Sequence, residues 1–109
     1  MSYDVASIPP FDKQVKRLAK KYPSLKNDLS VLGAQLSEDP TVGIPLGGNC
    51  FKIKMAIASK GKGKSAGAGV ITHFYTAEGI VFSLSIYDKS EQIDISNSEI
   101  ADLLAYIEE

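Results

Sequence analysis

Five lysines gather in one stretch of the chain that contains no acidic residue. They are Lys52, Lys54, Lys60, Lys62 and Lys64. Residues 40–77 lack Asp and Glu altogether, so this segment has a formal charge of +5 in a chain whose net charge is −1. Clustered ammonium groups lower one another's pKa and stabilise negative charge that develops on a phosphate. The segment therefore predicts a contact with a polyanion such as RNA.

The rest of the chain balances this charge. Residues 1–39 carry +1 and residues 78–109 carry −7, which favours a focused cationic site over a generally basic nucleic-acid binder. A length of 109 residues fits a single domain, residues 1–109. No apolar run approaches the roughly 20 residues of a membrane span. The N-terminus does not resemble a secretory signal, so we expect a cytoplasmic protein.

Helical periodicity covers the first part of the chain after a short possible edge strand within Ser2–Ile8. Apolar residues follow a helical spacing from Phe11 to Tyr22 and again from Leu25 to Leu36. Pro23 separates the two stretches, which predicts a helical hairpin. The glycines and proline of residues 43–49 then predict a loop.

The lysines fall where the period changes from helical to two residues. Lys52 and Lys54 alternate with apolar residues from position 51 to 57, so both are expected on the outer face of a strand. Residues 69–76 and 79–87 predict two further strands joined by a hairpin. Ser96 and Glu99 form a capping-box pattern before a short amphipathic helix. The sequence therefore predicts an α+β fold of order β-α-α-β-β-β-α, with an antiparallel sheet packed by the helical hairpin and a short C-terminal helix.

Other candidate sites are weaker. The segment from Ala58 to Ser65 differs at one residue from the pattern of a phosphate-binding P-loop, because Ala58 stands where the motif has glycine. A strand is expected to follow it, where that motif requires a helix. His73 lies within an apolar strand, which favours a packed histidine over a catalytic one. Cys50 is the single cysteine, which excludes an internal disulfide and a zinc site of several cysteines. The acidic residues show no metal-ligand spacing, so no metal or cofactor is expected.

Four segments together resemble a known family: Phe11–Pro23, Cys50–Lys54, Lys62–Ile71 and Tyr87–Ile100. In this order, and over nearly the whole chain, they are similar to the RelE/ParE superfamily of bacterial type II toxins, in particular its RelE and HigB-like branch. The resemblance implies a ribosome-dependent endoribonuclease that cleaves mRNA without metal, with the 2′-hydroxyl as nucleophile on the adjacent phosphate. It also implies a cognate antitoxin as partner, whose complex with the toxin could bind operator DNA.

Site residues follow from the same resemblance. Lys52 and Lys54 are similar to the strand lysines that act as base or phosphate clamp. Lys89 lies near a basic position that stabilises the transition state or protonates the leaving group, and Tyr87 would orient or stack on the substrate. The remaining lysines of the loop would hold the RNA backbone; these are Lys60, Lys62 and Lys64.

One position departs from the family pattern. The second strand of this hairpin usually begins with an arginine that clamps the scissile phosphate, and here that position is Gly69. Loss of one such preorganised donor typically costs about 10²–10³ in rate. The sequence therefore predicts an attenuated toxin that Gly69→Arg would strengthen. Two other functions stay open on the same fold: a ParE-like inhibitor of DNA gyrase, and an inactive module that only binds an antitoxin.

Overall fold

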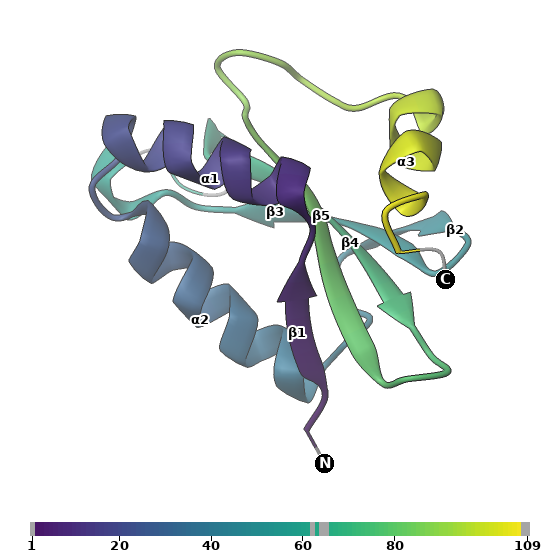
Figure 1. Ribbon diagram of the computed structural model, residues 1–109. Helices are drawn as coiled ribbons and strands as arrows, with labels where there is room; N and C mark the ends of the chain where they lie inside the picture. The colour runs from purple at the N-terminus through teal and green to yellow at the C-terminus, as the bar shows by residue number, and fades with distance from the viewer. Residues whose placement is uncertain (1, 62, 64–65, 108–109) are drawn as a thin grey trace.

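A five-stranded sheet organises the computed structural model, which describes residues 2–61, 63 and 66–107 (Figure 1). The strands are β1 (Asp4–Ser7), β2 (Ile44–Gly47), β3 (Cys50–Met55), β4 (Ala68–Tyr75) and β5 (Ile80–Asp88). Their order in the sheet is β1-β5-β4-β3-β2, with β1 parallel to β5 and every other pair antiparallel. The helices are α1 (Pro9–Lys21), α2 (Leu25–Glu38) and α3 (Asn97–Leu104), and η1 (Ala58–Lys60) is a short 3₁₀ turn. The predicted α+β fold is confirmed.

The predicted helical hairpin packs on one face of the sheet (Figure 1). Prolines occupy the first positions of α1, where a missing N–H costs nothing. Leu18 of α1 and Leu25 and Leu36 of α2 are at most 1% exposed and form the core with the sheet. Burial of such leucines contributes about 1.5–3 kcal/mol each relative to exposure. The apolar stripe of each helix therefore decides which face of the hairpin meets the sheet.

The two-residue period of β3 separates the core from the lysines. Phe51, Ile53 and Met55 are buried on the helical side of the sheet, as predicted. Lys52 and Lys54 lie on the opposite face, which α1 and α2 do not cover. At the end of this face, α3 begins with the predicted capping box, in which the Ser96 side chain and Glu99 satisfy each other's backbone N–H groups.

One strand was missed by the sequence prediction. Residues 44–47 were expected to be part of a loop, but they form the edge strand β2, which pairs with Cys50 to Lys52 of β3. Pro45 is tolerated because an edge strand has a side without a ladder partner. The glycines around it permit the tight return to β3, where Gly47 and Gly48 adopt positive φ angles.

A bulge in β5 sets the direction of the side chains near its end. Ser83 lies opposite Thr72 and Ser85 lies opposite Ile71, so Leu84 is an extra residue between the two pairs. Beyond this bulge, β5 presents Tyr87 to the face that carries Lys52 and Lys54, because its cross-strand neighbours share that face. Among the described residues, no helix is long and apolar enough to cross a membrane.

Candidate active site

Three lysine amines approach one another on the open face of the sheet. Lys52 and Lys54 come from β3, and Lys89 follows the last residue of β5. Partial burial lowers the pKa of Lys89, and the charges of Lys54 and Lys52 lower it further. An amine of this kind gives up its proton more readily than an ordinary lysine. The structure thus joins three of the four residues that the resemblance implied for catalysis into one cationic cluster, defined here as Lys52, Lys54 and Lys89.

An acidic side chain already contacts this cluster. The Nζ atom of Lys52 lies 3.4 Å from both carboxylate oxygens of Asp94, in the segment between β5 and α3. The hydrogen bond from the backbone N–H of Ile95 lowers the pKa of Asp94, and the contact with Lys52 lowers it further. Lys54 is exposed, and within the described part of the chain it forms no ion pair with a carboxylate. A carboxylate therefore occupies one side of a cluster that could bind phosphate.

Gly69 lies between Lys54 and Tyr87 in the sheet. It is the cross-strand partner of Lys54 on one side and of Tyr87 on the other. The Tyr87 ring covers Gly69 so closely that a Cβ atom there would lie 2.5 Å from Oη and 2.7 Å from Cε1. The space that an arginine side chain would need is thus occupied by Tyr87. Gly69→Arg, expected from the sequence to restore a phosphate clamp, would first have to displace this ring.

Tyr87 is more buried than its predicted role requires. The residue is 3% exposed, and burial raises the pKa of its hydroxyl. Its buried Oη atom makes no hydrogen bond to any described residue. A ring without an accessible face cannot stack on a base, so this conformation does not favour the stacking role. In this structure the ring covers Gly69, whose cross-strand partner on β3 is Lys54.

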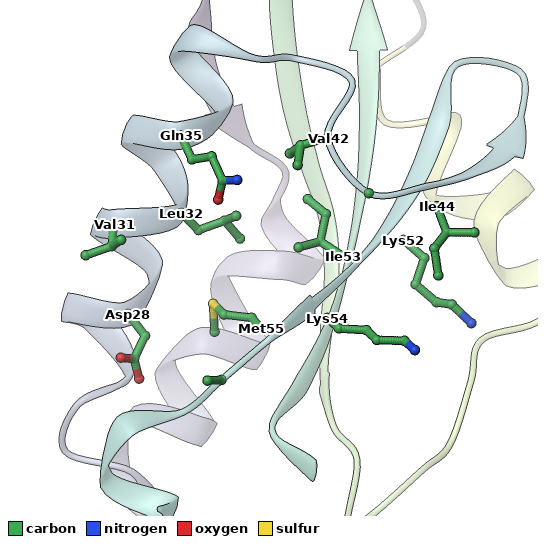
Figure 2. Close-up of a pocket in the computed structure, with 12 residues that line it drawn as sticks. Asp28, Val31, Leu32, Gln35, Val42, Ile44, Lys52, Ile53, Lys54 and Met55 are labelled. Carbon is green, nitrogen blue, oxygen red and sulfur yellow. The ribbon is translucent and has the colours of Figure 1, made fainter. Parts of the chain in front are cut away.

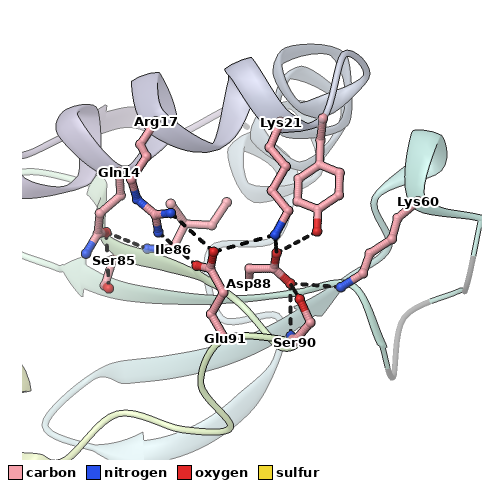
Figure 3. Close-up of polar contacts among 10 residues, drawn as sticks. Gln14, Arg17, Lys21, Lys60, Ser85, Ile86, Asp88, Ser90 and Glu91 are labelled. Carbon is pink, nitrogen blue, oxygen red and sulfur yellow. Dashed lines mark hydrogen bonds and ion pairs between the residues drawn. The ribbon is translucent and has the colours of Figure 1, made fainter.

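Lys60 forms an ion pair with the buried carboxylate of Asp88. Its Nζ atom lies 2.8 Å from Oδ1 of Asp88, and its side chain is only 12% exposed (Figure 3). The RNA-binding role of Lys60 stays a prediction that this arrangement does not favour. Lys62 and Lys64, assigned the same role, lie outside the described residues.

Asp88 is the centre of a buried polar network that sequence reasoning missed (Figure 3). Its carboxylate is fully buried and accepts hydrogen bonds from Lys21, Tyr22, Lys60 and Ser90. These donors outweigh the cost of burial and hold the pKa of Asp88 well below its usual range. The only signal in the sequence was an acid at the end of an apolar strand, and that pattern is also typical of an ordinary exit from a strand.

His73 and Cys50 lie side by side as cross-strand partners on β4 and β3. The Cys50 thiol is free and buried, and its Sγ atom is 3.5 Å from Nδ1 of His73. Burial lowers the pKa of His73, which is half-buried. The arrangement agrees with the predicted packed histidine.

A separate groove of about 550 Å³ lies between α2 and β3 (Figure 2). Leu32, Ile53 and Met55 line its apolar wall. The side chains of Lys52 and Lys54 border this groove, but Figure 2 shows their amines directed away from α2. The groove and the cationic cluster are therefore distinct features on the two sides of β3.

Comparison with known proteins gives a fold assignment. No family model matches the chain. The structure is similar to that of the free Escherichia coli toxin RelE carrying two arginine-to-alanine substitutions, with a TM-score of 0.65 and 15% sequence identity. The match covers 98% of this chain and 99% of the RelE chain. The fold implied by the resemblance is thereby confirmed: this chain has the fold of the toxin RelE.

Proposed function

We propose that this protein is the toxin of a type II toxin–antitoxin pair and cleaves mRNA on the ribosome in the cytoplasm. The observation that carries the proposal is the convergence of Lys52, Lys54 and Lys89, with the pKa of Lys89 lowered by burial and by the other two amines. The RelE-like fold supports the same reading. A cluster of three amines, one of which contacts the carboxylate of Asp94, suits the negative charge of a phosphodiester.

The chemistry requires groups that move protons and stabilise charge. The ribose 2′-oxygen attacks the adjacent phosphorus while the bond to the 5′-oxygen breaks, which leaves a 2′,3′-cyclic phosphate and a 5′-hydroxyl. Lys52 and Lys54 would act as base or clamp around the pentavalent phosphate. Lys89, whose pKa is lowered, would donate the proton that the departing 5′-oxygen needs. Positioning on the ribosome would bring the 2′-hydroxyl in line with the leaving group.

A direct test measures cleavage of a defined mRNA on bacterial ribosomes. The double variant Lys52→Ala/Lys54→Ala should lose at least about 100-fold in rate, because two groups that stabilise the transition state are removed. Its circular dichroism spectrum should remain that of the wild type, since both side chains lie outside the core. The matched control is Lys13→Ala/Lys16→Ala, which removes two lysines of α1 far along the chain from the cluster.

The outcomes separate the alternatives. Retained cleavage by the Lys52/Lys54 variant would remove both residues from the site. Intact mRNA together with accumulated gyrase–DNA breaks would instead identify a ParE-like gyrase inhibitor. Intact mRNA and undamaged DNA with tight binding to an antitoxin would identify an inactive binding module.

Attenuation of the activity is part of the same proposal. Gly69 offers no guanidinium to the phosphate, and the adjacent Tyr87 hydroxyl is buried. The three amines would then carry all of the charge stabilisation. We expect cleavage by the wild type to be slower than that of a relative with an arginine at this position, when both are measured on the same programmed ribosomes.

A further inference from the structure

A buried carboxylate connects the helical hairpin to the end of β5, one residue before the cationic cluster. Asp88 Oδ2 accepts hydrogen bonds from Tyr22 Oη at 2.6 Å and Lys21 Nζ at 3.2 Å, at the C-terminal end of α1. Its Oδ1 atom accepts from Lys60 Nζ at 2.8 Å. Asp88 therefore fixes β5 against both α1 and η1 through one ionised group (Figure 3).

The same carboxylate also shapes the turn that contains Lys89. Oδ1 of Asp88 accepts from the backbone N–H of Ser90 at 2.9 Å and from its hydroxyl at 2.7 Å. The carbonyl of Asp88 accepts from the N–H groups of Glu91 and Gln92. These bonds fold residues 88–92 into a turn immediately after the strand, because an aspartate that binds a nearby N–H competes with extended backbone.

Lys89 is thus held from both sides. The residue before it and the residue after it are joined through the Asp88 carboxylate. Its own N–H donates to the carbonyl of Gly67 at 3.1 Å. Gly67 in turn packs against the chain after β3, where a Cβ atom would lie 3.0 Å from Cα of Ala56 and 3.1 Å from N of Ile57. The backbone of Lys89 is fixed relative to the chain that carries Lys52 and Lys54.

From this geometry we infer that Asp88 is a positioning residue for the proposed reaction: its buried network fixes the turn that places the Lys89 amine beside Lys52 and Lys54. The inference rests on the proposed function for its catalytic meaning. It also explains why Lys60 is withdrawn from the surface, since its ammonium group is used in this network rather than on a substrate. Asp88 itself lies on the helical side of the sheet and would not touch RNA.

Two variants and one control test the inference in the full chain. Ser90→Ala removes one hydroxyl bond to Asp88 and leaves the backbone bond in place, so the protein should fold. Asp88→Asn keeps the shape and removes the charge. The matched control is Ser7→Ala, which removes a 2.6 Å hydroxyl bond to Asp12 at the N-terminal end of α1.

Two readouts are needed, one of them independent of activity. Carbon-13 NMR of labelled lysines, with the Lys89 signal assigned through Lys89→Arg, follows the titration of each amine. In Ser90→Ala we expect the Lys89 pKa to rise toward that of an ordinary lysine, and in Asp88→Asn to rise further. On programmed ribosomes, kcat of Ser90→Ala should fall about fivefold, the effect of one lost hydrogen bond, with KM unchanged. Ser7→Ala should alter neither readout.

The readouts also distinguish this inference from the proposed function. If Ser90→Ala and Asp88→Asn both fold and the Lys89 titration stays as in the wild type, the positioning role is overturned. If the titration shifts but the wild type cleaves no mRNA, Asp88 still positions Lys89 and it is the proposed function that fails. A fall in stability without any change in the Lys89 titration would reduce Asp88 to a structural anchor and likewise overturn the inference.

Discussion

Substitution of Gly69 by alanine tests how the surface beside the cationic cluster is built. The added Cβ atom would lie 2.5 Å from Tyr87 Oη and 2.7 Å from Cε1, whereas ordinary contacts at this atom begin at 3.4 Å. The backbone cannot yield easily, because Gly69 pairs with Lys54 and Tyr87 on its two sides. The Tyr87 ring must therefore move out of a buried position, since the residue is only 3% exposed. Overpacking of this kind costs about 1–3 kcal/mol.

The expected free energies differ between two backgrounds. In the wild type, Gly69→Ala should lower the free energy of unfolding by about 2 kcal/mol. In a Tyr87→Ala background the clash is absent, and alanine should be neutral or stabilise the strand by about 0.5 kcal/mol relative to glycine. The resulting coupling energy is about 2 kcal/mol, which is typical of residues in direct contact.

Urea unfolding followed by circular dichroism measures all four proteins of this cycle. The Tyr87→Ala protein serves as the reference for the double variant, so the change in unfolding free energy that Tyr87→Ala itself causes cancels. If Gly69→Ala lowers the free energy of unfolding equally in both backgrounds, the Tyr87 ring does not pack against Gly69, and the close contact between them is refuted. The same result would make Gly69→Arg a simple test of a missing phosphate clamp, since no ring would then have to move.

Two further predictions concern the acidic side chains near the cluster. Asp94→Asn should tighten binding of a short single-stranded RNA at least about threefold, because Lys52 loses a competing carboxylate. Asp102→Asn on α3 is the control. Unchanged or weaker RNA binding by the Asp94→Asn protein would contradict the prediction. The pKa of Asp88 is lower in the folded state than its value of about 3.8 in the unfolded chain. The ionised carboxylate therefore stabilises the folded protein at a pH above 3.8, and this stabilisation is lost as the pH falls below that value. The wild type should therefore lose unfolding free energy more steeply than Asp88→Asn between about pH 5 and about pH 3; equal slopes in urea unfolding would show that Asp88 is not the responsible group.

Most of the fold could be predicted because its signals are local. The stripe from Phe11 to Tyr22 and the alternation around Lys52 each lie within one element, where periodicity directly reports burial. The edge strand β2 was missed because Pro45 and its neighbouring glycines are typical of a loop, and its pairing depends on β3 rather than on its own composition.

The site was harder to predict because its contacts are not local. The lysines on β3 could be found from their alternation, and Lys89 from the resemblance. The network of Asp88 joins it to Lys21 and Tyr22, which lie 67 and 66 residues away in the sequence, and nothing near Asp88 indicates those partners. The contact of Tyr87 with Gly69 likewise depends on strand register, which no short pattern specified.

The extra residue in β5 has a consequence for how this gene could change. Ser83 and Ser85 lie opposite consecutive residues of β4, Thr72 and Ile71, so Leu84 is the residue between them without a partner on that strand. An in-frame deletion of its codon would make the pairing regular and would leave Tyr87 opposite Gly69 and Asp88 opposite Ala68. Because paired residues share a face of the sheet, the phenol would stay beside Lys54 and the carboxylate would stay on the helical side. In β4 each residue from 68 to 73 has a partner on both sides, so the loss of one residue there would shift the register and exchange the faces of the residues beyond it. The chain should therefore tolerate a one-residue deletion at Leu84 better than one in β4.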